Sequence, residues 1–305
     1  MVGGRGVSAG TTPNTMARAV EVGADFVLPR GTVIGDVGGH AGRFAIEGFL
    51  DGGGEGTTYL ASRVVRHSFP EVEVTEYVCL KIVRGEVHEL RERALRAMRA
   101  VVGLRHENLL RITGSFIADI DVGGGRTSQR WVIASELCDG GTLEERVAAG
   151  GYTAEEAIDW MLQISEGVHF LHRQTPSQVH QDLKLQNVCL RGPRRVPVII
   201  DFGSLVEIFS TVTAGTEPRD DHGTPWYKSP ERLRHPGRVS RADDIWSLGL
   251  VFLQIWARRV LHSPVIPARD RVDVDRVLGS MGGIGEFAPR HDDLASLFQK
   301  MLNDD

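Results

Sequence analysis

Cysteine is scarce in this chain, with only three residues among 305. The three lie far apart and form no CxxC pair, which excludes a disulfide framework and argues against a cysteine-rich zinc site. Such scarcity is typical of a protein that works in a reducing, intracellular compartment, so we expect a cytoplasmic location.

Long apolar runs and a large excess of charge are also missing. The formal net charge is −5 at pH 7, which predicts neither nucleic acid nor an anionic membrane as the main partner. The first ten residues contain four glycines and no apolar segment, unlike a secretory signal. The most apolar stretch, Ile245–Trp256, is shorter than the roughly 20 residues of a membrane span. We therefore expect a protein without a membrane span, in which this stretch is a buried helix.

The first 135 residues contain two kinds of sequence. Residues 1–43 have no sustained periodicity and predict a flexible arm. Residues 44–135 contain short runs rich in β-branched and aromatic residues, interrupted by one helical pattern over Glu86–Val102. Asp119–Arg130, which contains several glycines, predicts an exposed hairpin insertion. The expected strands are Phe44–Leu50, Thr57–Val65, Val72–Arg84, Leu109–Ile117 and Trp131–Ser135.

Helical patterns dominate the rest of the chain. Long amphipathic segments in residues 141–305 predict helices over Ala154–His172, Ala242–Ala257 and Asp292–Leu302. A short connection, residues 136–140, separates this helical part from the strand-rich part. The pattern predicts an α+β fold of two lobes joined by a hinge, with a cleft between the lobes.

One polar cluster has the composition that phosphoryl transfer needs. Asp182 and Asn187 lie five residues apart with Lys184 between them, and Asp201 follows an apolar strand further along. A carboxylate can orient an attacking hydroxyl, a cation can neutralise phosphoryl oxygens, and amide and carboxylate oxygens can bind a divalent metal ion. The cluster therefore predicts a phosphotransfer site with a magnesium ion.

Further motifs flank this cluster in the order found in one enzyme family. Val78–Lys81 is similar to the strand whose lysine binds nucleotide phosphates, and Gly223–Glu231 resembles the end of an activation segment. Asp243–Gly249 resembles the buried helix that supports the catalytic loop. From about Phe44 to Asp305, the chain resembles the eukaryotic-type (Hanks-type) serine/threonine protein kinases. The resemblance implies a small β-rich N-lobe, a larger α-helical C-lobe and a nucleotide cleft between them.

The resemblance also implies a role for each matching residue. Asp182 would orient the substrate hydroxyl, and Lys184 would neutralise the γ-phosphoryl group of ATP. Asn187 and Asp201 would hold magnesium, or manganese in its place, and Lys81 would bind the α- and β-phosphates. The other implied contacts to ATP come from the glycine-rich loop, the two faces of the adenine site and the hinge: Leu50, Gly53, Gly56, Thr58, Cys79, Cys189, Glu136 and Cys138.

Four features depart from the family pattern. Asp51 and Glu55 occupy loop positions where the family has a glycine and an apolar residue, so an ordinary glycine-rich hairpin is the alternative interpretation of this loop. Ala97 stands where the family has the glutamate that pairs with the strand lysine. Gln181 replaces the arginine that clamps a phosphorylated activation segment. The chain ends at Asp305 after a segment similar to the penultimate helix, which implies a domain truncated before its final helix.

These observations leave two functions open. The first is a protein kinase that uses ATP to phosphorylate a protein substrate, and Lys184 two residues after Asp182 favours serine and threonine over tyrosine. The alternative is a pseudokinase, a nucleotide-binding or scaffold module with weak or no phosphotransfer. The departures in the glycine-rich loop and at Ala97 favour the pseudokinase, whereas the joint presence of Asp182, Asn187 and Asp201 favours the enzyme.

Overall fold

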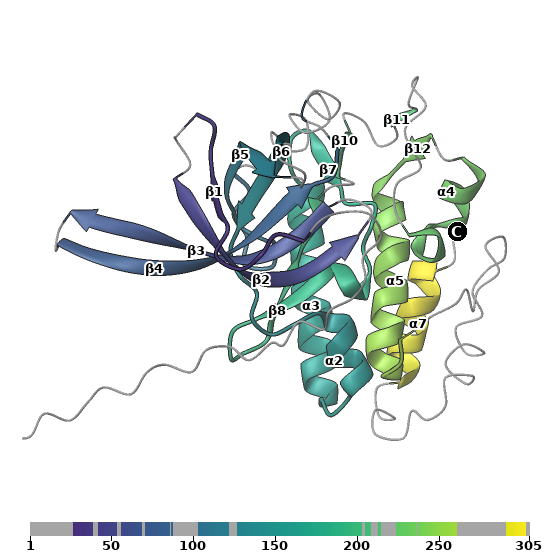
Figure 1. Cartoon of the computed structure of the whole chain (residues 1–305). Coiled ribbons are helices and arrows are strands. Elements are labelled where there is room, and N and C mark those ends of the chain that lie inside the picture. The colour runs from purple at the N-terminus through teal and green to yellow at the C-terminus, as the bar shows by residue number, and fades with distance from the viewer. Residues whose placement is uncertain are drawn as a thin grey trace, which may run out of the picture.

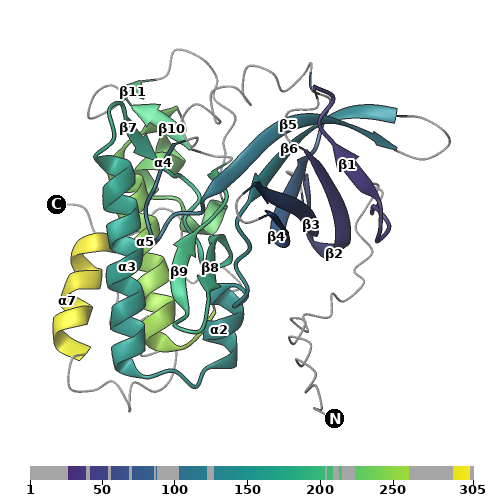
Figure 2. The ribbon, with the colours of Figure 1, turned by 90° about the vertical axis from the view of Figure 1, so that its left-hand side faces the viewer.

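The computed structural model describes residues 27–38, 42–53, 56–68, 71–85, 87, 103–121, 127–202, 205–208, 213–214, 224–235, 237–260 and 291–302 of the chain. In these ranges the chain forms a six-stranded sheet, three two-stranded sheets and a group of packed helices. The large sheet lies beside the helical half of the molecule (Figures 1 and 2). The expected α+β architecture with a β-rich N-lobe and a helical C-lobe is therefore confirmed.

The N-lobe is an antiparallel sheet with the strand order β1-β2-β3-β4-β6-β5. Phe44 and Ile46 alternate with less buried residues along one strand, as expected for a sheet with one face on a core. All five expected strands are present, although the fourth begins three residues later than predicted. The strands are β1 (Val33–Gly35), β2 (Arg43–Gly53), β3 (Gly56–Ser68), β4 (Glu71–Val83), β5 (Ile112–Asp121) and β6 (Thr127–Ser135).

Strand β1 was not predicted from the sequence. It pairs with β2, and Leu28 and Ile34 are buried in the core of the N-lobe. The assignment of residues 1–43 to a flexible arm is therefore wrong for residues 27–37, while residues 1–26 lie outside the described residues. A strand of three residues is too short to show a period of two, so its pairing with β2 determines it rather than a local pattern.

The burial of Ile34 predicts that β1 stabilises the lobe. Replacing Ile34 by alanine removes buried methyl groups and should lower the free energy of unfolding by about 2 kcal/mol. Replacing the neighbouring Val33, which is 49% exposed, by alanine should lower it by less than about 0.5 kcal/mol. Chemical denaturation followed by fluorescence measures both changes, and equal effects of the two substitutions would contradict the position of β1.

Strands β3 and β4 form a long hairpin that extends beyond the neighbouring strand β6. They pair along their whole length, but β4 contacts β6 only through Cys79–Ile82. The far half of the hairpin therefore projects from the body of the lobe (Figure 1). Two cross-strand ion pairs lie on this half, Arg63–Glu76 at 2.7 Å and Arg66–Glu73 at 2.6 Å.

The insertion expected at Asp119–Arg130 is a continuation of β5 and β6. The two strands pair as far as Asp121 and Thr127, so the predicted hairpin is confirmed. Its expected exposure is wrong at Ile120, which is buried in the N-lobe core. The helix expected at Glu86–Val102, with Ala97, lies outside the described residues apart from residue 87.

Helices of the C-lobe are capped at their first turn by the residue that precedes them. Thr142, Thr153 and Ser240 each begin a helix with a capping box, which satisfies backbone N–H groups that have no partner within the helix. Helix α5 is buried on almost all sides, which confirms the buried helix predicted there. The helices are α2 (Leu143–Ala149), α3 (Ala154–His172), α4 (Pro230–Arg234), α5 (Arg241–Ala257) and α7 (His291–Leu302).

Small two-stranded sheets accompany the helices of the C-lobe. They pair β7 (Ser177–Val179) with β10 (Val206–Ile208), β8 (Val188–Arg191) with β9 (Val196–Ile199), and β11 (Thr213–Ala214) with β12 (Arg238–Val239). Short 3₁₀ turns occur at η1 (Leu185–Asn187) and η3 (Pro225–Tyr227). No helix in the described ranges is long and apolar enough to cross a membrane.

The two lobes are also joined by contacts outside the hinge segment itself. Ile199 at the end of β9 donates its N–H to the carbonyl of Asn108 at 2.8 Å, and its own carbonyl accepts the N–H of Leu110 at 2.9 Å. The segment that precedes β5 is therefore docked on the C-lobe, and Leu109 is part of the C-lobe core. This contact fixes the base of the N-lobe against the strand that leads to Asp201.

Candidate active site

The loop between β7 and η1 takes its shape from one buried carboxylate. Asp244 of α5 is fully buried and accepts the backbone N–H groups of His180 and Gln181, each at 2.9 Å. His172 of α3 adds a third contact, with its Nε2 atom 2.8 Å from Asp244 Oδ2. The backbone of Gln181 has a positive φ of 68°, an uncommon conformation that these hydrogen bonds stabilise. Helix α5 therefore holds the loop that presents Asp182.

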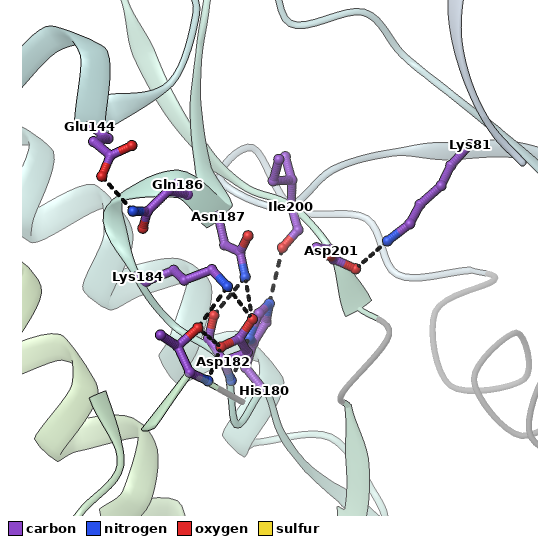
Figure 3. A network of polar contacts seen from close by, with 10 residues as sticks. Lys81, Glu144, His180, Asp182, Lys184, Gln186, Asn187, Ile200 and Asp201 are labelled. Carbon is purple, nitrogen blue, oxygen red and sulfur yellow. Dashed lines mark hydrogen bonds and ion pairs between the residues drawn. The ribbon is translucent and has the colours of Figure 1, made fainter. Parts of the chain in front are cut away.

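Asp182 is the centre of the polar network in Figure 3. Its Oδ1 atom accepts the backbone N–H of Thr224 at 2.8 Å and the Thr224 hydroxyl at 2.9 Å. Its Oδ2 atom accepts Lys184 Nζ at 2.8 Å and Asn187 Nδ2 at 2.9 Å. Two donors on each oxygen account for all four lone-pair sites of a carboxylate and fix its orientation. The structure thus brings together three of the residues predicted from the sequence.

Thr224 is a member of this network that the sequence analysis did not assign. Its hydroxyl donates to Asp182 and accepts from Lys184 Nζ at 2.8 Å. Thr224 is separated from Asp182 by 42 residues, so no local spacing connects the two. The available signal was its position in the Gly223–Glu231 motif, directly before a proline.

Lys81 and Asp201 meet across the two lobes. Lys81 Nζ lies 2.8 Å from Asp201 Oδ1, which joins β4 to the residue two positions after the end of β9 (Figure 3). Both side chains keep about a quarter of their surface exposed, at 25% and 28%. The sequence predicted no glutamate partner for Lys81. In this structure Asp201 is a counter-ion of this lysine.

Asn187 and Asp201 offer oxygen ligands that suit magnesium. Both hydrogens of the Asn187 amide nitrogen are donated to Asp182, one to its backbone carbonyl at 2.8 Å and one to Oδ2, so the amide oxygen is turned away from these bonds. Ile200 N–H donates to the Asn187 carbonyl at 2.9 Å, which holds the two candidate ligands near each other. The described residues contain no group of three or more His, Cys, Asp or Glu placed for a metal ion. One carboxylate and one amide fit magnesium that takes its other ligands from phosphate groups and water.

The glycine-rich loop joins β2 and β3, and its residues 54–55 lie outside the described residues. Gly53 and Gly56 are paired across the turn, and Thr58 is paired with Lys81. A Cβ atom at Gly56 would lie 2.2 Å from the Ile82 carbonyl oxygen, so only glycine fits this close approach of β3 to β4. Leu50, in the preceding strand β2, is 39% exposed. The described residues on the β3 side of the loop therefore lie beside the strand that carries Lys81.

The three cysteines lie in partly buried positions around the hinge. Burial raises the pKa of the Cys79 thiol to about 11 and that of Cys189 to about 12, and also raises the pKa of Cys138. Cys189 further raises the pKa of Cys138, and Cys79 that of Cys189, because neighbouring thiolates would repel each other. The three thiols are therefore close enough to influence one another's pKa.

The carboxylate of Glu136 is occupied by contacts within the protein rather than available to a nucleotide. Its carboxylate forms an ion pair with Arg191 Nη1 at 3.0 Å and accepts the backbone N–H of Arg111 at 2.9 Å. The backbone N–H of Glu136 donates to the Arg111 carbonyl at 3.0 Å, and the Glu136 carbonyl accepts the Ser135 hydroxyl at 3.2 Å, so only a further lone pair of this carbonyl is left for a nucleotide contact. The carboxylate instead ties the hinge to β8.

Sequence comparisons relate the chain to known protein kinases. A model of the protein kinase domain family matches residues 55–303. Cyclin-dependent kinase-like 2 from Rattus norvegicus is 27% identical over 203 residues, which are 66% of this chain and 36% of that protein. A protein named as a serine/threonine-protein kinase from Dictyostelium discoideum is 30% identical over 218 residues, which are 66% of this chain and 18% of that protein.

A shorter match involves the mitogen-activated protein kinase kinase kinase mom-4 from Caenorhabditis elegans. It is 36% identical over 107 residues, which are 35% of this chain and 18% of that protein. The matched regions thus span at most about a third of these relatives. The family model, in contrast, covers most of this chain, including the Asp182 loop, Asp201 and the supporting helix α5. The chain therefore belongs to the protein kinase family.

Proposed function

We propose that this chain is a protein kinase that transfers the γ-phosphoryl group of ATP to serine and threonine hydroxyls of a protein substrate. The observation that supports this proposal is the Asp182 carboxylate, which three side chains and one backbone N–H hold at 2.8–2.9 Å. Phosphoryl transfer depends mainly on positioning and charge stabilisation, so a fixed carboxylate beside a lysine suits it. The serine/threonine-protein kinase among the relatives is consistent with this substrate class.

The network around Asp182 also implies how a substrate hydroxyl enters. All four lone-pair sites of the carboxylate are used, so one donor must leave before a hydroxyl can donate to it. Lys184 is the donor that can move, because its flexible stem can turn the ammonium group toward a γ-phosphoryl oxygen. The vacated Oδ2 site would then accept the substrate hydroxyl and its proton.

The remaining residues would bind the nucleotide and its metal ion. Lys81 would bind phosphate oxygens, and Asn187 and Asp201 would hold magnesium, which supplies charge neutralisation on the phosphates when bound. In the structure Lys81 and Asp201 neutralise each other at 2.8 Å. This ion pair keeps both groups in place for the nucleotide, although Ala97 cannot act as the lysine's partner.

A second candidate function is a pseudokinase that binds nucleotide without transferring phosphate. Asp51 favours it, because this residue stands at a phosphate-facing loop position and its Oδ1 atom accepts Gly52 N–H at 2.8 Å. That contact uses a backbone N–H group near the turn and leaves a negative charge close to the loop. An acidic group there would repel phosphate oxygens.

Phosphoamino acid analysis tests the proposal. The chain is incubated with radiolabelled ATP, magnesium and a generic basic-protein substrate, and the hydrolysed product is separated. We expect label on phosphoserine and phosphothreonine. Label on phosphotyrosine alone would contradict the substrate class, and absence of label from nucleotide-bound protein would favour the pseudokinase.

The Thr224 hydroxyl should contribute to the rate. Replacing Thr224 by valine keeps the backbone N–H bond to Asp182 but removes a hydrogen bond to each of two charged groups, Asp182 and Lys184. We expect the transfer rate to fall about 10- to 100-fold. Replacement by serine, which restores the hydroxyl, should keep the rate within a few fold. Equal rates for the valine and serine variants would contradict this role.

The cysteines provide a test of the nucleotide site. Thiolates are the reactive species, and the raised pKa values of Cys79 and Cys189, about 11 and 12, leave few thiolates at neutral pH. The alkylation rate of these residues should therefore be low at pH 7. It should still rise with pH up to about pH 10, a range in which the rate for an ordinary thiol levels off. Saturating ATP with magnesium should slow modification of Cys138 and Cys189. Peptide mass spectrometry measures both effects, and rates that ATP leaves unchanged in nucleotide-bound protein would contradict the adenine site.

A further inference from the structure

A cavity lies beside the hinge, outside the Asp182 network. It has a volume of about 350 Å³, and Leu104 and Leu109 are the apolar residues among those that line it. The segment before β5, the hinge and β8 form its walls, so both lobes contribute to it. Its volume lies at the lower end of the range for small-molecule sites and exceeds that of a bare inorganic ion.

The lining of this cavity is strongly cationic. Arg105, Arg111 and Arg191 all line it, and Glu136 is its single acidic residue. At neutral pH the three guanidinium groups and the one carboxylate give the lining a net charge of about +2. A ligand that neutralises this charge would be a dianion.

One wall of the cavity is rigid. Arg191 Nη1 contacts both carboxylate oxygens of Glu136 at 3.0–3.1 Å, and its Nη2 atom donates to the Glu107 carbonyl at 2.9 Å. These bonds use most of the donors of Arg191 and cancel the charge of Glu136. The ion pair of Arg191 and Glu136 is therefore held in place and is neutral as a pair. The excess positive charge of the lining belongs to Arg105 and Arg111.

Those two arginines keep most of their donors. Arg105 Nη1 donates to the carbonyl of its neighbour Leu104 at 2.8 Å, which leaves its other N–H groups available. Within the described part of the chain, the Arg111 guanidinium has no hydrogen bond or ion pair. His106 adds a further donor to the lining, because its Nδ1 atom accepts Asn108 N–H at 3.1 Å and the proton of the neutral ring is then on Nε2.

We infer that this cavity binds a phosphomonoester, with Arg105 and Arg111 as the groups that bind the phosphate. A phosphomonoester carries a charge of about −1.5 to −2 at pH 7, which matches the net charge of the lining. Guanidinium groups bind phosphate oxygens in a bidentate manner, so two of them suit this group better than a monoanionic carboxylate. The volume and the two apolar lining residues leave room for the organic part of the ligand. The inference is independent of the proposed phosphotransfer.

Isothermal titration with O-phosphoserine tests the site in the full chain without nucleotide, at about 0.15 M salt to screen distant charges. We expect saturable binding that the double variant Arg105→Gln, Arg111→Gln weakens at least tenfold. The matched control is Arg194→Gln, Arg195→Gln, which removes the same charge from two exposed arginines in the turn between β8 and β9. It should change the affinity less than twofold, as should Lys81→Met, because Lys81 belongs to the expected nucleotide site.

Several outcomes would overturn the inference: no saturable binding to the wild-type chain, equal loss in both arginine double variants, or loss only with Lys81→Met.

A peptide that carries one phosphoserine separates the two sources of the ligand. Tighter binding of this peptide than of O-phosphoserine would identify a phosphorylated protein segment, whereas equal affinity would identify a small phosphomonoester. Equal binding of the unphosphorylated peptide would contradict recognition of the phosphate. Thermal unfolding confirms that each variant is folded.

Discussion

Replacing Asp182 by asparagine is expected to lower the rate of phosphoryl transfer about a thousand-fold or more and to leave ATP binding within a few fold of wild type. Asparagine has nearly the same shape, but it cannot take up the proton of a substrate hydroxyl. Its amide nitrogen would also face donors, because all four groups around the carboxylate are donors. The loss therefore concerns chemistry rather than the nucleotide.

A radiolabelled transfer assay and an ATP titration of the same preparation measure the two quantities. The matched control is Asp119→Asn, which makes the same chemical change at an exposed position of β5. This control should keep its transfer rate. Equal turnover by wild type and Asp182→Asn would contradict the central role of Asp182.

Replacing Asp244 by alanine should have the largest effect on stability. Asp244 is fully buried, accepts two backbone N–H groups of the loop that presents Asp182, and contacts His172. Its removal leaves these buried donors without an acceptor, which should lower the free energy of unfolding by about 3–5 kcal/mol. The loop would also lose the support that positions Asp182, so transfer should fall even in protein that remains folded.

Chemical denaturation of Asp244→Ala measures the loss of stability. The exposed Asp159 of α3, which accepts only the Gln163 side chain among the described contacts, gives a control variant Asp159→Ala with an expected loss below about 1 kcal/mol. Asp244→Asn keeps one acceptor oxygen and should fall between wild type and alanine. Equal stability of Asp244→Ala and Asp159→Ala would mean that the loop is supported in another way.

Local sequence patterns predicted the elements whose own residues determine them. The period of α3 and the apolar character of α5 are repeated over many residues, so their positions were predicted to within a residue or two. Strand β1 has only three residues and depends on pairing with β2, so no local pattern could predict it. For the same reason Ile120 appeared to be exposed, because its burial depends on strands elsewhere in the sheet.

The candidate site was predictable where its residues are close in sequence. Asp182, Lys184 and Asn187 lie within six positions, and the structure joins them as the spacing predicted. The pair between Lys81 and Asp201 spans 120 residues and could be anticipated only through the family resemblance. The ion pair between Glu136 and Arg191, which occupies the hinge carboxylate, had no signal in the sequence at all.

The most direct measurement of the proposed function compares binding and transfer in the wild-type chain. Thermal unfolding with and without ATP and magnesium reports nucleotide binding, and autophosphorylation with radiolabelled ATP in the same preparation reports transfer. The arrangement of Asp182, Lys184, Asn187 and Asp201 predicts both a rise in the unfolding temperature and incorporation of label that magnesium removal abolishes. A rise in the unfolding temperature without any incorporation of label would contradict the proposed kinase activity and would identify a pseudokinase.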